Sequence, residues 1–174
     1  MSIEIIGHAV VSADGRIADR NRQMPAVLRN DKDWLRFQAA LDRAVLVVLG
    51  RLGHEAHPNP GRRRLVLTSR VDGLEPIDDL VTLWNPAGMD FRDVVVKLGI
   101  ADGVVAVTGG QQVFDYFLRR FTQFDLVTVD GALIPDGVPC FSGGWPDEML
   151  AEAGLRATDR ELLDPGVRLD VWRR

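Results

Sequence analysis

The 174-residue sequence contains a single cysteine, Cys140. An internal disulfide and a multi-cysteine metal site are therefore excluded, and the composition fits a reducing cytoplasm. Because no paired histidine signature accompanies Cys140, we interpret it as a small, buried hydrophobic residue.

Long apolar stretches are also missing. The first residues, MSIEIIGHAVVSADG, lack a basic segment followed by a long apolar core. Nowhere do the roughly 18 consecutive apolar residues of a membrane span occur. We therefore expect a cytoplasmic protein that neither carries such an export signal nor spans a membrane.

Positive charge is scarce, since the formal net charge is -4 and the sequence pI is ≈ 5.4. Lysine and arginine are not interleaved with aromatic residues as a nucleic-acid surface requires, so we expect no nucleic-acid partner. One local excess of positive charge, Arg62 to Arg64, follows a glycine. It is either a solvated loop or a site for an anion.

Internal repeats and linkers are absent as well. The residues are 46% hydrophobic and 26% charged, which is typical of a globular protein and not of a disordered one. A chain of this length buries enough surface for one core. We expect a single domain over residues 1–174, and the sequence leaves a monomer and a homodimer both open.

The first half of the chain alternates strand and helix patterns. Residues 3–13 predict a central strand that ends at the turn-forming pair Asp14-Gly15, and residues 15–29 predict a long loop. Asn30 or Asp31 is positioned to cap an amphipathic helix. The apolar run at 44–50 predicts a buried strand of a parallel sheet. The apolar positions of the helix are Trp34, Leu35, Phe37, Ala39 and Leu41.

The second half continues the alternation. Further strands are predicted within residues 63–70, 80–84, 103–110 and 124–134, with helices at 90–98 and 111–121. The tail differs, because residues 155–162 and 167–174 flank the turn Asp-Pro-Gly and predict an antiparallel hairpin. The sequence thus predicts an α/β fold with a mostly parallel sheet and a C-terminal hairpin.

Two segments, 47–55 and 105–118, share the order buried strand, glycine, helix. The free amides and the positive dipole end of a first helical turn attract phosphate, and glycine lets the backbone approach closely. Neither segment contains the GxGxxG or GxxxxGK[ST] pattern, so each is either a tight turn or a phosphate site.

A metal site is not expected. His54, Glu55 and His57 form HEAH, which is one residue shorter than the zinc-binding HExxH helix, and no further cluster of ligands accompanies it.

The segment MPAVLRNDKDW at 24–34 resembles a motif of the dihydrofolate reductase family, in which an acid follows Met-Pro by six residues and a tryptophan lies nearby. LGRLGHE, PGR, LTSR, VTGGQQVFDYFL and FDLVTVD follow in the family's order. The resemblance covers about residues 3–143 and implies a three-layer, dihydrofolate-reductase-like fold and a reductase that uses NADPH.

The resemblance also implies a role for individual residues. Asp31 becomes the catalytic residue and hydrogen-bonds the substrate ring, although an isolated Asp before a helix is equally explained as its cap. Leu35 and Arg62 become further substrate contacts. Arg51 and Arg70 favour NADPH over NADH. The implied cofactor-binding residues are Val10, Ile17, Gly50, Arg51, Gly53, Ser69, Arg70, Gly109, Gly110, Gln111 and Val113.

The substrate remains open at this stage. Gly53, Ala26 and Val127 depart from the dihydrofolate reductase pattern. Residues 12–19 and 136–141 instead resemble the reductase domain of riboflavin synthesis, which acts on a ribosylaminopyrimidine phosphate. Three functions follow: reduction of a pterin, reduction of the riboflavin-pathway pyrimidine, or nucleotide binding without catalysis.

Overall fold

The computed structural model describes residues 2–57 and 59–174. Their strands are β1 Ile3–Ser12, β2 Arg16–Ala18, β3 Leu46–Gly50, β4 Arg64–Leu67, β5 Leu74–Pro76, β6 Val81–Trp84, β7 Gly103–Val107, β8 Gln123–Val129, β9 Val138–Pro139, β10 Arg156–Asp164 and β11 Val167–Arg173. The helices are the 3₁₀ turn η1 Ala26–Leu28, and α1 Asp31–Arg43, α2 Arg51–Ala56, α3 Phe91–Lys97, α4 Gln111–Phe117 and α5 Pro146–Glu152.

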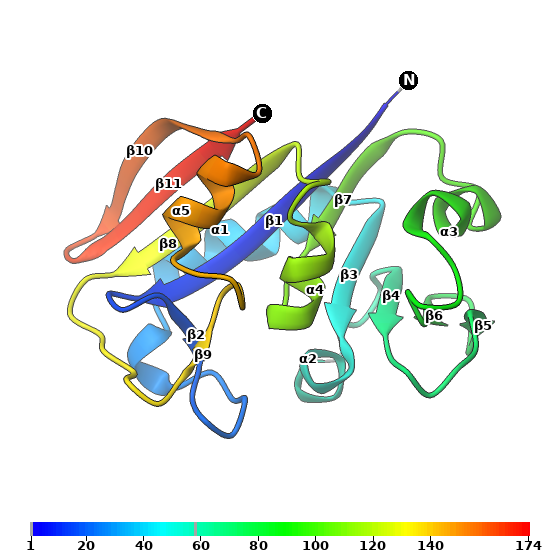
Figure 1. Ribbon diagram of the computed structural model, residues 1–174, viewed down its shortest axis with the longest axis horizontal. Helices are drawn as coiled ribbons and strands as arrows, with labels where there is room; N and C mark the ends of the chain where they lie inside the picture. The colour runs from blue at the N-terminus through cyan, green and yellow to red at the C-terminus, as the bar shows by residue number, and fades with distance from the viewer. Residues whose placement is uncertain (1, 58) are drawn as a thin grey trace.

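Nine strands form one sheet in the order β10-β11-β8-β1-β7-β3-β4-β6-β5 (Figure 1). The strands from β8 to β6 run parallel to one another, whereas β5, β10 and β11 are antiparallel to their neighbours. The predicted α/β fold, with its mostly parallel sheet and C-terminal hairpin, is confirmed.

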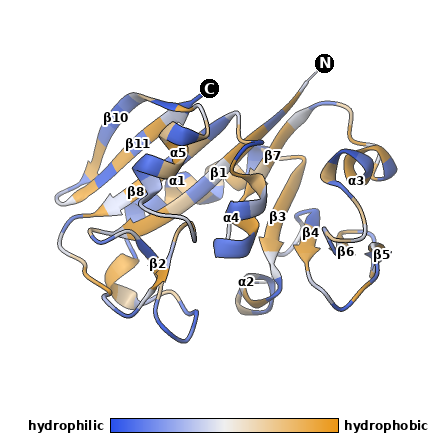
Figure 2. Ribbon diagram, in the orientation of Figure 1, coloured by the Kyte–Doolittle hydropathy of each residue, from blue (hydrophilic) through white to orange (hydrophobic). Residues whose placement is uncertain are grey.

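The sheet is covered on both faces, as the apolar sequence of β3 predicts. Leu46 and Val48 pack into a core with α3, α4 and α5, whereas Val47 and Leu49 pack with Leu41 of α1 on the opposite face. Figure 2 shows the hydrophobic character of β3 and β4. Because successive side chains of a strand point to opposite faces, one apolar strand serves two cores and three layers result.

The side chain of Asn30 caps α1. Its Oδ1 accepts hydrogen bonds from the amides of Lys32 (3.0 Å) and Asp33 (3.1 Å), which are two of the donors left free at a helix start. Asp31 is therefore the first helical residue and not the cap. The helix itself matches the predicted one.

Five short elements differ from the sequence-based expectation. The predicted loop at 15–29 contains η1 and β2, and β2 pairs with β9 in a separate two-stranded sheet. Strand β5 and helix α5 were not predicted. Each of these elements has seven residues or fewer, which is too short for a periodic pattern to be distinctive.

Within residues 2–57 and 59–174, no helix combines the length and the apolar character needed to cross a bilayer.

Gly7 on β1 lies close to the buried rings of Phe121 and Phe124. A Cβ atom at this position would lie 2.3 Å from Phe124 Cδ2 and 2.8 Å from Phe121 Cε1, both on buried rings. Gly7→Ala should lower the free energy of unfolding by about 1–3 kcal/mol, as overpacking does, in urea titrations. Gly131→Ala is the matched control, since no heavy atom lies within 4 Å of its Cβ position. An equal effect of both substitutions would contradict the close approach at Gly7.

Candidate active site

A cleft of about 1310 Å³ opens at the carboxyl ends of the parallel strands. Val10, Gly50, Leu67 and Thr108 line it, and these residues lie at or just beside the ends of β1, β3, β4 and β7. Strand β7 returns between β1 and β3, so the strand order reverses here. Ligands of open α/β sheets bind in the crevice at such a reversal.

The cleft brings together every residue that the sequence implied for the cofactor. Residues from five separate segments therefore converge, although the sequence places them up to 103 positions apart. They are Val10, Ile17, Gly50, Arg51, Gly53, Ser69, Arg70, Gly109, Gly110, Gln111 and Val113.

The two strand-glycine-helix junctions adjoin each other, because the Gly50 amide donates to the Gly109 carbonyl at 2.9 Å. Neither α2 nor α4 has a side chain that caps its first turn. Gly109 has φ +100° and precedes a cis peptide to Gly110. A Cβ at Gly109 would lie 2.8 Å from the Phe114 ring, so this junction requires glycine.

The structure does not bring Asp31, Leu35 or Arg62 into the cleft. Asp31 and Leu35 are exposed on α1, and Leu35 retains 69% of its accessible surface. Arg62 donates to Asp42 at 2.7 and 3.1 Å and to Asn59 Oδ1 at 2.9 Å. The lining of the cleft contains none of these three predicted residues.

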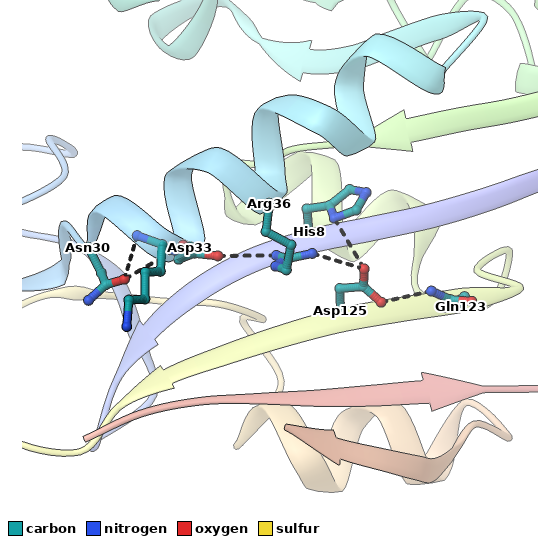
Figure 3. Close-up of polar contacts among 7 residues, drawn as sticks. His8, Asn30, Asp33, Arg36, Gln123 and Asp125 are labelled. Atoms are coloured by element: carbon teal, nitrogen blue, oxygen red, sulfur yellow. Dashed lines mark hydrogen bonds and ion pairs between the residues drawn. The ribbon is translucent and has the colours of Figure 1, made fainter. Parts of the chain in front are cut away.

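Helix α1 contributes one acidic residue to the lining of the cleft, Asp33, which keeps only 8% of its accessible surface. Arg36 Nη2 donates to Asp33 Oδ1 at 3.2 Å, and Arg36 Nη1 donates to Asp125 Oδ2 at 3.3 Å. His8 Nδ1 lies 3.6 Å from the same Asp125 oxygen, and Gln123 donates to the other at 2.8 Å. Figure 3 shows this row, which joins α1 to β1 and β8.

Burial shifts the pKa values of two groups in the cleft lining, His8 and Asp33, in the direction that favours their neutral forms. It lowers the pKa of His8 from 6.5 to about 4, with Arg36 and Arg43 acting in the same direction and Asp125 opposing them. Burial likewise raises the pKa of Asp33, while the guanidinium of Arg36 opposes the rise. His8 is consequently neutral at pH 7.

The mouth of the cleft is bordered by the two segments that resemble the riboflavin-pathway reductase. Arg16 and Ala18 of β2 pair with Pro139 and Val138 of β9, and the Arg16 guanidinium donates to the Gly137 carbonyl at 3.2 Å. Ile17, Gly137, Val138 and Pro139 all line the cleft. Two segments more than 100 residues apart thus form one rim.

Sequence reasoning missed Asp33, Arg36 and His8. Asp33, Phe37 and Leu41 recur every four residues, and all three face the cleft. Helical periodicity therefore contained the signal for Asp33, since an acid on the inward stripe is the buried one. No local pattern marks His8, which lies in a mostly apolar strand.

Comparisons with known proteins give matches at the level of structure. No family model and no curated protein sequence matches the chain. Among solved structures, a bifunctional diaminohydroxyphosphoribosylaminopyrimidine deaminase and 5-amino-6-(5-phosphoribosylamino)uracil reductase from Thermotoga maritima superposes with a TM-score of 0.69 at 16% identity. The match covers 98% of this chain and 56% of that one, so the chain spans just over half the length of the bifunctional protein.

Two further structures match along nearly their whole length. A Shewanella sp. PV-4 protein assigned to riboflavin biosynthesis has a TM-score of 0.67 and 19% identity, with 98% of each chain covered. Dihydrofolate reductase from Enterococcus faecalis, complexed with NADP(H) and RAB-propyl, has a TM-score of 0.68 and 15% identity. That match covers 98% of this chain and 96% of the reductase.

The topology defines a three-layer α/β protein with a ligand cleft at the carboxyl ends of its strands. Within that class, the three matches show that the chain has the dihydrofolate-reductase-like fold. The fold implied by MPAVLRNDKDW and the segments that follow it is confirmed.

The lowered pKa of His8 predicts a specific loss of stability in acid. The folded state binds this proton less readily than the unfolded state, so the stability present above pH 6.5 is lost as the pH falls toward 4. In this window the free energy of unfolding falls by up to about 1.4 kcal/mol for each pH unit. Asp33 acts in the opposite direction, because its raised pKa favours the folded state as it takes up a proton.

Comparing the wild type with His8→Asn isolates the histidine contribution. The difference between their free energies of unfolding, measured in urea at a series of pH values, should change with pH only below 6.5. His57→Gln, at an exposed position, should follow the wild-type curve. A difference for His8→Asn that is constant with pH would show that His8 titrates normally.

Proposed function

We propose that this chain is an NADPH-dependent reductase that transfers a hydride to a pterin or pyrimidine substrate. The observation that carries the proposal is the single cleft in which two uncapped helix starts lie on one side and the buried carboxyl of Asp33 on the other. One side suits a dinucleotide phosphate backbone, and the other suits a heterocycle with hydrogen-bond donors.

The lining of the cleft fits NADPH. Five arginines but only two acidic residues line it, on a chain whose net charge is -4. The backbone at Gly50 and Gly110 would bind the diphosphate through first-turn amides, because no side chain occupies them. Arg51 and Arg70 would contact the phosphate that distinguishes NADPH from NADH. When bound, the cofactor supplies the hydride.

The protein residues near the acceptor ring would orient it and supply electrostatic stabilisation. Val10 and Ile17 would pack beside the nicotinamide and exclude water. In this proposal the role that the sequence suggested for Asp31 belongs to Asp33, because Asp33 faces the cleft. Its carboxyl would hold the neutral acceptor through a hydrogen bond and assist proton uptake at the reacting C=N bond during hydride transfer.

Two features bear on the choice of substrate: the hydrogen bonds of Arg62 and the β2–β9 pairing at the mouth of the cleft. A glutamate tail clamped by Arg62 would compete with Asp42 and Asn59, which already accept from its guanidinium. The β2–β9 rim, in contrast, unites the two segments that resemble the riboflavin-pathway reductase. These observations support keeping the riboflavin-pathway pyrimidine as a candidate substrate beside dihydrofolate.

Turnover tests the proposal directly. Purified protein mixed with NADPH and either dihydrofolate or the ribosylaminopyrimidine phosphate should oxidise the cofactor, followed by its nicotinamide absorbance. Tight NADPH binding without oxidation across a panel of pterins and pyrimidines would instead indicate a non-catalytic nucleotide-binding module.

Asp33→Asn tests the acid. Loss of the negative charge should lower kcat by on the order of 100-fold near neutral pH, with partial recovery in acid as solution supplies the proton. NADPH affinity, measured by titration, should change little. Asp31→Asn is the matched comparison, two residues away on the same helix. Loss of activity in Asp31→Asn with a normal Asp33→Asn enzyme would restore the assignment made from the sequence.

Arg70→Ala tests the preference for NADPH. The Arg70 side chain makes no hydrogen bond or ion pair with the described residues, so it is available for a phosphate. Its removal should weaken NADPH binding by about 10-fold or more, as for a charge-assisted hydrogen bond, and leave NADH binding nearly unchanged. Equal weakening of both cofactors would show that Arg70 does not recognise the extra phosphate. Arg92→Ala, on α3, serves as the control.

A further inference from the structure

Arg36 occupies an unusual place on the cleft wall, between the carboxylates of Asp33 and Asp125. Two of its nitrogens, Nη1 and Nη2, donate to these carboxylates. The third, Nε, is buried and has no hydrogen-bond partner among the described residues. Less than 1 Å² of Nε is accessible, so a ligand in the cleft would meet the guanidinium as a cation and not through this N–H.

Asp33 uses only one of its two carboxylate oxygens in hydrogen bonds with the described residues. Its Oδ1 accepts from Arg36 Nη2 at 3.2 Å, whereas its Oδ2 accepts no hydrogen bond from the residues that the structure describes. The wall therefore offers a ligand one acceptor oxygen beside a guanidinium cation. A lone carboxylate would offer two acceptor oxygens.

The arrangement is held in place from behind. Asp125 is fixed by Gln123, which donates to its Oδ1 at 2.8 Å, and by the backbone pairing of β8 with β1. His8, the neighbour of Asp125 in that register, remains neutral at pH 7 and adds no competing positive charge. Arg36 is thus oriented before a ligand binds, which limits the entropy cost of binding.

Two kinds of heterocycle edge interact differently with this wall. An amino-pyrimidine edge pairs best with both oxygens of a free carboxylate and takes up a proton, so its positive charge would lie beside the Arg36 guanidinium. An edge with neighbouring N–H and carbonyl groups is neutral. Its N–H would donate to Asp33 Oδ2, and its carbonyl oxygen, which carries partial negative charge, would lie beside the Arg36 guanidinium.

We propose that Arg36 is a specificity-determining residue, which together with Asp33 makes the cleft select an oxo-pyrimidine edge over an amino-pyrimidine edge. The proposal rests on the proposed function, because it takes the Asp33 side of the cleft as the place where the acceptor ring binds. It adds the class of ring that this place accepts.

Two ligands with the same ring frame test the selection: pteridine-2,4-dione and 2,4-diaminopteridine. Their dissociation constants are measured by calorimetry, with and without NADP⁺. The wild type should bind the dione about 10-fold more tightly or better, since the protonated diamine would place its positive charge beside the Arg36 guanidinium. Arg36→Met should reduce this preference by about 10-fold or more, because it frees Asp33 Oδ1 and removes the repelling charge.

Two further variants separate specificity from folding. Arg36→Lys keeps a cation between the two carboxylates, so it should still disfavour the diamine. Arg92→Met, at an exposed position on α3, removes a cation that lies outside the cleft lining and should leave the preference unchanged. The ratio of the two constants is read in every variant, because an unfolded fraction weakens both ligands equally and cancels.

A wild-type preference for the diamine, or an unchanged ratio in Arg36→Met, would overturn the role of Arg36. Failure of both rings to bind, with or without NADP⁺, would overturn it as well. Failure of the reductase proposal is distinguishable, because it appears as absent NADPH oxidation while the ring preference is read from binding alone.

Discussion

Arg36 lies between two carboxylates that belong to different layers of the protein, Asp33 on α1 and Asp125 on β8. Both acids are largely withdrawn from water, and removing the partner of a buried charge costs about 3–5 kcal/mol. The interaction therefore sets where α1 rests on the sheet. Because α1 forms one wall of the cleft, the width and polarity of the cleft depend on the same contact.

The opposite wall depends on the backbone. Strands β3 and β7 are neighbours, and each ends in a glycine-containing junction before a helix. The hydrogen bond from the Gly50 amide to the Gly109 carbonyl joins the two junctions. One wall is thus built from charged side chains and the other from main-chain amides. This division suits a ligand with a heterocycle at one end and phosphates at the other.

Much of this architecture could be predicted from the sequence. The strands β1, β3, β7 and β8 and the hairpin β10–β11 follow from apolar runs and turn residues, because long elements carry a strong local signal. Strands β2 and β9 could not be predicted, since three and two residues form strands only through pairing with each other. The eleven residues that the resemblance implied for the cofactor all line the cleft.

The acid predicted from the sequence, Asp31, and the acid that lines the cleft, Asp33, differ by two positions for a physical reason. Counting from Met24-Pro25 selected Asp31, whereas the direction of a side chain on a helix depends on a period of 3.6 residues. Asp33 shares the inward stripe with Phe37 and Leu41, and Asp31 does not. Arg36 and His8 could not be identified in this way, because their roles depend on Asp125, which is distant in sequence.

The terminal hairpin β10–β11 contacts the start of α1 through Asp164. This carboxylate accepts a hydrogen bond from the side-chain Nδ2 of Asn30 at 2.9 Å and forms an ion pair with Lys32 at 3.3 Å. The residue that caps α1 is therefore anchored to the far edge of the sheet. A chain cut before β10 would keep every residue that lines the cleft, yet the first turn of α1 would lose the outer support that helps position Asp33.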